Sequence, residues 1–158
     1  MKKLIYNNKN ILFILSICFL SIIFNFHYGY RGVFPIDSFL IYDSGYNVLN
    51  GNYPFKNYWS ITGPLLDYLQ AFFFLIFGVN WFSYVLHASI LNLSLALLSY
   101  FVFKELGLKQ SYSFIYSLGI SLLAYPSIGV PFIDHHSTIF SILSIYCFIL
   151  ALKRKNNF

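Results

Sequence analysis

The polarity pattern of the chain consists of long apolar runs separated by short polar stretches. Four of the runs are long enough, or nearly so, to cross about 30 Å of hydrocarbon as helices rising 1.5 Å per residue. We therefore predict transmembrane helices at about residues 10–26, 81–103, 111–132 and 137–152, the last of which extends into its flanks. The expected fold class is an all-α membrane protein in which residues 1–158 form a single membrane domain.

The first run begins like a signal peptide, with basic residues ahead of an apolar core. The segment from Asn25 to Tyr30 lacks a small-x-small cleavage site, so we expect an uncleaved membrane anchor.

A fifth apolar run, residues 64–77, is too short for a comfortable span and better suits an interfacial or re-entrant helix. If it does not span and the N-terminus is cytoplasmic, eight Lys and Arg residues lie inside, and only Arg31 and Lys56 lie outside. If it spans, three lie inside and seven outside. The positive-inside rule favours the first arrangement, in which both termini are cytoplasmic and residues of about 27–80 form a long external loop.

Composition agrees with a membrane location. Only 9% of the residues are charged and 58% are hydrophobic, whereas soluble domains have about 25% charged residues. The net charge of +5 is spread over short clusters beside apolar runs, which predicts contact with membrane lipids rather than nucleic acid. Cys18 and Cys147 lie within apolar runs and are interpreted as small apolar side chains. We expect an integral multi-pass protein of a bacterial inner (plasma) membrane.

The external loop is predicted to contain two short interfacial helices. The first covers residues 38–50, with Asp37 as its N-cap and Gly51 as its stop. Asp43, Asn47 and Asn50 share one face of this helix and form a candidate hydrogen-bonding strip.

The second interfacial helix covers residues 64–77, with Thr62 near the cap and Gly78 after the end. Asp67 and Gln70 share one of its faces. A solvated polar face is the slightly favoured interpretation of Asp67, and a functional carboxylate is the alternative.

The predicted orientation places Asp37, Asp43, Asp67 and Asp134 outside and Glu105 inside, although acidic residues played no part in assigning it. Asp37 is interpreted first as a helix cap and second as a general base at the membrane surface. A single carboxylate can serve both purposes.

The tripeptide Asp134-His135-His136 starts the fourth span. Asp134 suits a helix cap, and adjacent histidines on a helix point in different directions. No bound cofactor is expected. The alternative, a divalent-metal site made by one histidine and a first-loop carboxylate, is the less favoured interpretation. His27 and His87 are interpreted as interfacial or bundle-facing polar residues.

The order of these motifs resembles the GT-C glycosyltransferases, in particular the protein O-mannosyltransferase and aminoarabinose transferase branch. The matching stretches are Pro-Ile-Asp-Ser at 35–38, Tyr-Asp-Ser-Gly-Tyr at 42–46, Leu-Asn-Gly-Asn-Tyr-Pro-Phe at 49–55, Gly-Pro-Leu-Leu at 63–66, Leu-Gln-Ala at 69–71 and Phe-Gly at 77–78. Asp134 falls where the family has a second loop carboxylate. The sequence departs from the family at Ser38 and Asn57, where an acidic residue is common. The resemblance covers nearly the whole chain and corresponds to the amino-terminal part of a typical family member.

The resemblance implies transfer of a sugar from a polyprenyl-phosphate donor to an acceptor on the external face. Asp37 would deprotonate the acceptor hydroxyl, which attacks the anomeric carbon with inversion, and Asp134 would orient the acceptor or support a metal ion.

Four further residues are assigned to substrate binding. Arg31 or Lys56 would neutralise the donor phosphate; juxtamembrane snorkelling is the alternative for both. Asp43 and Asp67 would complete the external polar surface.

Two other functions compete with glycosyl transfer. One is a non-catalytic fragment or accessory subunit of a larger membrane enzyme. The weaker one is a small transporter, which would require charged residues inside the predicted spans, and none is present there.

Overall fold

The protein is helical. The computed structural model describes residues 8–32, 37–126 and 128–155, and the regular secondary structure of these residues is helical apart from an isolated bridge between Pro54 and Tyr58. The elements are α1 (Asn8–Gly29), the 3₁₀ turn η1 (Asp37–Phe39), α2 (Leu40–Leu49), α3 (Pro64–Phe77), α4 (Trp81–Glu105), α5 (Gln110–Leu123) and α6 (Ile133–Lys155).

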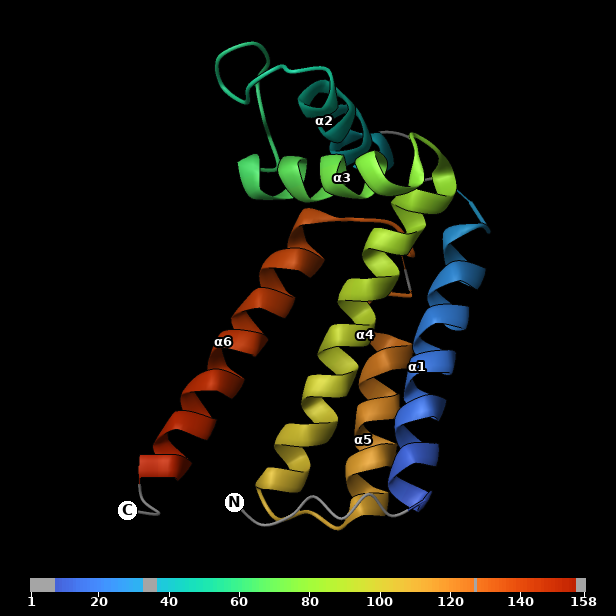
Figure 1. Cartoon of the computed structure of the whole chain (residues 1–158), viewed down its shortest axis with the longest axis vertical. Helices are drawn as coiled ribbons and strands as arrows, with labels where there is room; N and C mark the ends of the chain where they lie inside the picture. The colour runs from blue at the N-terminus through green and yellow to red at the C-terminus, as the bar shows by residue number, and fades with distance from the viewer. Residues whose placement is uncertain (1–7, 33–36, 127, 156–158) are drawn as a thin grey trace.

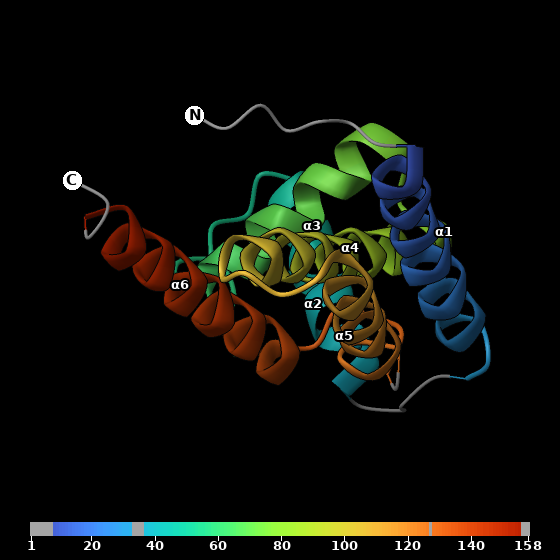
Figure 2. The same cartoon turned by 90° about the horizontal axis from the view of Figure 1, so that it is seen from below.

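Helices α1, α4 and α5 pack side by side, and α6 packs on α4 but leans away from the other two (Figures 1 and 2). Helix α3 lies across one end of this bundle, with α2 packed on it (Figure 1). The first turn of α1 and the last turn of α6 both lie at the opposite end, on different sides of the bundle (Figures 1 and 2). The α2–α3 segment between α1 and α4 is therefore folded onto the bundle as a cap.

Three of the described helices are long and apolar enough to cross a membrane: α1, α4 and residues Ile133–Lys153 of α6. This agrees with the prediction of a membrane protein with several helical spans. The fourth helix of the bundle, α5, has only 14 residues.

The predicted helix over residues 111–132 is wrong in its second half, because α5 ends at Leu123. Pro126 disfavours a helical conformation in the residue before it, and Gly129 has a φ of +73°. The chain therefore reaches Ile133 in a non-helical conformation.

A close approach of two glycines holds this non-helical stretch against α1. A Cβ atom on Gly129 would lie 2.3 Å from the backbone nitrogen of Gly29, so no larger residue fits without a shift of the backbone. Nearby, the Asn25 Nδ2 atom donates to Ser89 Oγ (2.9 Å) and to the carbonyl of Gly129 (3.1 Å). The side chain of Asn25 thus joins α1, α4 and the stretch after α5.

The bundle end opposite α3 is held by another asparagine. The Asn10 Oδ1 atom accepts hydrogen bonds from Tyr100 (2.5 Å), Lys104 (2.9 Å) and Gln110 (3.2 Å). These donors come from α4 and α5, so one buried oxygen on α1 fixes all three helices at this end.

The start of the first cap helix also differs from the prediction. Helix α2 begins at Leu40, its N-cap residue is Phe39, and no side chain caps it. Asp37 instead begins the tighter turn η1, two residues before this N-cap, so the prediction that Asp37 is the N-cap was wrong. The predicted stop is confirmed, because Gly51 follows α2 with a φ of +82°.

Helix α3 has the predicted bounds. Pro64 lies in its first turn, and Gly78 ends it with a φ of +82°. The N-cap is Gly63, and Thr62 lies just before it.

Candidate functional site

The most enclosed acidic group of the cap is Asp67, which is fully buried on α3. Its Oδ2 atom accepts a hydrogen bond from the Tyr58 hydroxyl (2.8 Å), and its Oδ1 atom accepts one from the Thr62 hydroxyl (2.9 Å). The interpretation of Asp67 as part of a solvated polar face was therefore wrong. The linker between α2 and α3 folds back over α3 and supplies both donors.

Tyr58 is tied to Asp67 electrostatically as well as by the hydrogen bond. Burial raises the pKa of the Tyr58 phenol, and the hydrogen bond to Asp67 and its negative charge raise it further. The phenol therefore stays protonated as a donor over the whole physiological range.

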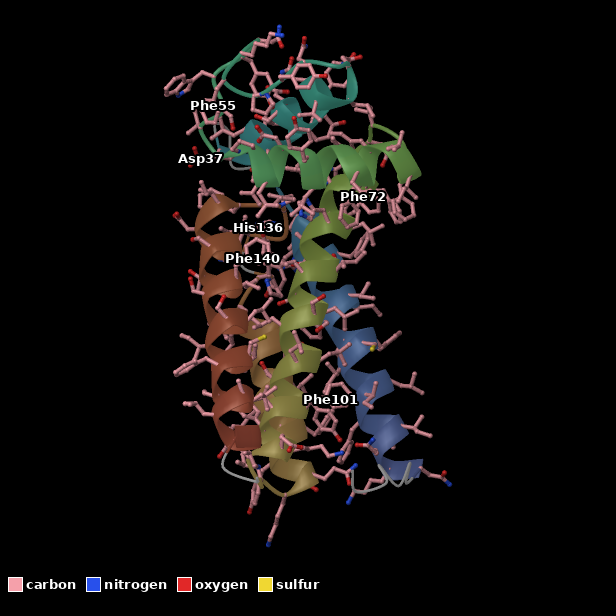
Figure 3. All side chains as sticks on the ribbon, turned by 60° about the vertical axis from the view of Figure 1, so that its left-hand side comes forward. Asp37, Phe55, Phe72, Phe101, His136 and Phe140 are labelled. Atoms are coloured by element: carbon pink, nitrogen blue, oxygen red, sulfur yellow. The ribbon has the colours of Figure 1, made fainter. Side chains whose placement is uncertain are left out.

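Directly beneath α3, four buried polar side chains form a continuous row. Gln70 Oε1 lies 2.9 Å from His87 Nδ1, and His87 Nε2 lies 3.1 Å from His136 Nε2. His136 Nδ1 in turn lies 2.8 Å from the Tyr125 hydroxyl, which accepts from the backbone N–H of Phe132 at 2.8 Å. The row joins α3, α4, α6 and the segment after α5, and Figure 3 shows His136 below the cap.

One set of tautomers satisfies every nitrogen and oxygen contact along the row, while the Gln70 Nε2 atom is left without a partner in the described part of the chain. Tyr125 donates to His136 Nδ1, His136 Nε2–H donates to His87 Nε2, and His87 Nδ1–H donates to Gln70 Oε1. The opposite polarity has His136 Nδ1–H donating to the Phe132 carbonyl at 2.9 Å, and it requires Gln70 to turn its amide. Gln70 thus determines the direction in which the hydrogens point.

The other three aspartates are exposed. Asp37 starts η1, Asp43 lies on α2 and Asp134 lies in the first turn of α6. Asp37 lies at the capped end of the bundle, the end at which α6 also begins (Figure 3). Residues 35 and 36 of the first family-like motif lie outside the described residues.

The predicted strip on α2 does not form through side chains. Asn47 donates its amide to the backbone carbonyl of Asp43 (3.0 Å), and Asn50 donates to that of Tyr46 (2.9 Å). Both amides therefore bond to their own helix, and the Asp43 carboxylate faces solvent.

The two adjacent histidines point in different directions, as expected. His136 is buried in the row beneath α3, whereas His135 lines a cavity between α4 and α6. In the described ranges no group of three or more His, Cys, Asp or Glu side chains is placed to hold a metal ion.

The two cations assigned to substrate binding, Arg31 and Lys56, lie against aromatic rings. The Arg31 guanidinium lies 5.6 Å from the ring centre of Tyr28, and Lys56 Nζ lies 5.5 Å from that of Tyr53. Both cations are exposed, so ring contact keeps them at the surface and leaves their hydrogen-bond donors available to a ligand.

A groove runs along the bundle between α5 and α6, with Leu95 of α4 as its floor. The cavity farther from the cap, called the lower cavity, has a volume of about 440 Å³. It is lined by Leu95, Tyr116, Gly119, Ile120, Leu123, Ala124, Ile142 and Tyr146. The cavity nearer the cap, called the upper cavity, has a volume of about 200 Å³. It is lined by Leu95, Ala124, Asp134, His135, Thr138, Ile139 and Ile142. The two cavities share three lining residues and therefore adjoin.

Sequence reasoning missed the partners of these groups. Tyr58 and Thr62 were not identified as ligands of Asp67, and the pairing of His87 with His136 was not predicted. The available signal was the placement of Gln70 three residues after Asp67, which puts two polar groups on one face of an otherwise apolar helix.

Comparison with protein-family models, with curated proteins and with solved structures found no match to this chain.

Proposed function

We propose that the protein is a GT-C-like glycosyltransferase, or the amino-terminal part of one, that moves a sugar from a polyprenyl-phosphate donor to an acceptor on the external face. The observation that supports this most is the placement of two exposed carboxylates on separate segments: Asp37 lies at the capped end of the bundle (Figure 3), and Asp134 lies in the first turn of α6, which begins at that end (Figure 1). A carboxylate at a lipid surface can meet both a lipid-borne donor and a polar acceptor.

In this proposal Asp37 accepts the proton of the acceptor hydroxyl. The hydroxyl oxygen then bonds to the anomeric carbon, and the bond from that carbon to the phosphate oxygen breaks, with inversion. The bonding electrons leave with the polyprenyl phosphate. Asp134 orients the acceptor, and Arg31 and Lys56 neutralise the phosphate.

Of the two remaining carboxylates, only Asp43 is assigned to substrate binding. Its side chain is exposed on α2 and is therefore accessible to a hydroxyl-bearing substrate. Asp67 is given a structural role instead, since Tyr58 and Thr62 already occupy its two oxygens.

The proposal includes four crossings of a bacterial inner membrane with both termini cytoplasmic. Support comes from the path of the chain: α5 and the stretch after it return to the capped end, from which α6 descends (Figure 1). Lys9, Lys104 and Lys109 lie at or beside the helix ends opposite the cap, and Arg31 and Lys56 lie on the cap side. This distribution follows the positive-inside rule.

The test is sugar transfer from polyprenyl-phosphate donors in membranes containing the protein. Replacement of a general base is expected to lower the rate by about 10²–10⁴-fold, so Asp37→Asn should abolish most of the transfer. The matched control is Glu105→Gln, at the opposite end of the bundle, which should leave transfer unchanged. If Asp37→Asn transfers at the wild-type rate, the assignment of the base is wrong.

A second candidate is an accessory subunit of a larger membrane enzyme. The specific observation in its favour is the outer face of α6, where Ile145, Phe148 and Leu152 are exposed. Co-purification with a larger membrane enzyme, together with no transfer by the isolated chain, would support this function. Transfer by the isolated chain would exclude it.

A further inference from the structure

The groove between α5 and α6 is open along its length and lies at the depth of the membrane-spanning helices. Its floor comes from α4 and one wall from α6, and both helices are long and apolar enough to span. An apolar cavity of about 150 Å³ is large enough to bind benzene. The lower cavity of about 440 Å³ therefore has room for a considerable length of aliphatic chain.

Gly119 is the feature that points to a ligand. A glycine inside a helix costs about 1 kcal/mol relative to alanine, so it usually has a packing reason. Gly45 has one, because a Cβ atom there would lie 2.6 Å from Gln70 Cγ. A Cβ atom on Gly119 would meet nothing within 4 Å. A close contact with a neighbouring helix therefore does not explain Gly119. The effect of its missing side chain is to widen the groove.

The polarity of the lining changes along the groove. The lower part is apolar except for two tyrosines, and the hydroxyl of Tyr146 lies 3.0 Å from Ser99 Oγ. The upper part contains Asp134, Thr138 and His135. The groove thus matches an amphiphile that is apolar below and polar at the capped end.

The upper residues also define the chemistry of the polar group. The Asp134 carboxylate repels an anion and accepts hydrogen bonds from hydroxyl groups. His135 Nδ1 is buried without a hydrogen-bond partner in the described part of the chain. Hydroxyl groups, which both donate and accept, fit these residues better than a phosphate does.

We propose that the α5–α6 groove binds the aliphatic chain of a membrane lipid whose neutral, hydroxyl-bearing head group meets Asp134 and Thr138. The site shares Asp134 with the proposed sugar transfer, in which this residue orients the acceptor, but lipid binding in the groove requires no turnover and can be measured by itself.

The experiment uses the full chain in phosphatidylcholine vesicles with dodecyl glucoside that carries a photoreactive diazirine in its chain. Labelled residues are mapped by mass spectrometry and are expected on the groove sides of α5 and α6. Unlabelled dodecyl glucoside should compete, and dodecyl phosphate should compete about tenfold less well, as expected for about 1.4 kcal/mol of difference at the head group.

Gly119→Trp fills the groove and should lower labelling about tenfold, and the smaller Gly119→Leu should lower it by about threefold. Neither variant meets a neighbour at Cβ, and both remove a helix-interior glycine, so both should fold. The matched control is Ile115→Trp, on an exposed position of α5 that does not line the groove.

The proposal is overturned if both Gly119 variants label like wild type, or if the exposed face of α1 around Leu15 and Phe19 labels as strongly as the groove. Better competition by dodecyl phosphate would overturn the neutral head group. Since labelling is read without transfer, a failure of Asp37→Asn to affect sugar transfer would leave these outcomes unchanged.

Discussion

His87 and His136 face each other through their Nε2 atoms, which lie 3.1 Å apart although the residues are 49 positions apart in the chain. A hydrogen bond between two imidazole nitrogens needs one donor and one acceptor. The two rings must therefore hold complementary tautomers, which their outer partners Gln70 and Tyr125 determine. Through this contact α6 is joined to α4 directly beneath the cap.

Replacement of either histidine by alanine should destabilise the protein by about 2–4 kcal/mol, because a buried partner loses its hydrogen bond and a cavity forms. The double variant should be less destabilised than the sum of the single variants by about 1 kcal/mol or more, since the second change removes the orphaned partner. Unfolding in mixed detergent measures all three. The exposed His27→Ala serves as the control, and additive effects of His87→Ala and His136→Ala would contradict direct coupling.

Because Gly129 is in close contact with Gly29, replacement of Gly129 by alanine should destabilise the protein more than the same replacement at Gly51. Gly129→Ala combines a φ of +73° with a Cβ atom 2.3 Å from a backbone nitrogen, so it should cost more than about 3 kcal/mol. Gly51→Ala has a similar φ of +82° but open space around it, so it should cost only about 1–2 kcal/mol. Thermal unfolding compares them. Equal decreases in unfolding temperature would show that the contact with Gly29 is not the reason why position 129 requires glycine.

The hydrogen bond between Tyr58 and Asp67 should contribute measurably to stability. Tyr58→Phe removes a donor to a buried carboxylate and should cost about 1.5–3 kcal/mol. Tyr68→Phe, which removes an exposed hydroxyl from the same region, is the control and should change little.

The same bond has a defined pH dependence. Because the pKa of Tyr58 is raised in the folded state, its stabilising contribution is complete below the ordinary tyrosine pKa of about 10. As the pH rises further towards the folded pKa, the unfolded state loses its proton first and this contribution is lost. The difference in unfolding temperature between wild type and Tyr58→Phe should be constant from about pH 7 to 9 and shrink above about pH 10. A difference that grows above this pH would contradict the assignment.

The limits of the sequence-based prediction have physical causes. The bounds of α3 could be predicted because Pro64 and Gly78 mark its two ends. The third span was predicted too long because apolar residues continue past Pro126, and hydrophobicity reports burial in the membrane rather than helical conformation.

The candidate site was less predictable than the fold. The burial of Asp67 depends on donors from a linker that polarity alone assigns to the surface. The pairing of His87 with His136 depends on how α4 and α6 cross, and no local pattern in the sequence specifies that crossing. Asp37 and Asp134 are exposed, and both their external location and their catalytic roles stay predictions.

The four-crossing arrangement predicts which positions a membrane-impermeant maleimide can reach. After Cys18 and Cys147 are replaced by serine, Asp134→Cys should react from the external side of intact cells. Lys109→Cys, before α5, should react only after the membrane is opened. External labelling of Lys109→Cys would show that α4 does not carry the chain back to the cytoplasmic side.

A reporter fused after Phe158 provides the matching control and should be cytoplasmic. An external reporter at this position would overturn the four-crossing model.

The hydrogen bonds around α3 also imply an order of assembly. Asp67 finds its partners five and nine residues earlier in the chain, whereas the partner of His87 is made 49 residues later. Synthesis proceeds from the N-terminus, and short-range contacts cost the least entropy to close. The cap can therefore settle while the ribosome is still making α6. During that interval the His87 Nε2 atom on α4 lacks its hydrogen-bond partner, His136 on α6. Packing of α6 onto α4 is therefore the last step in forming the bundle.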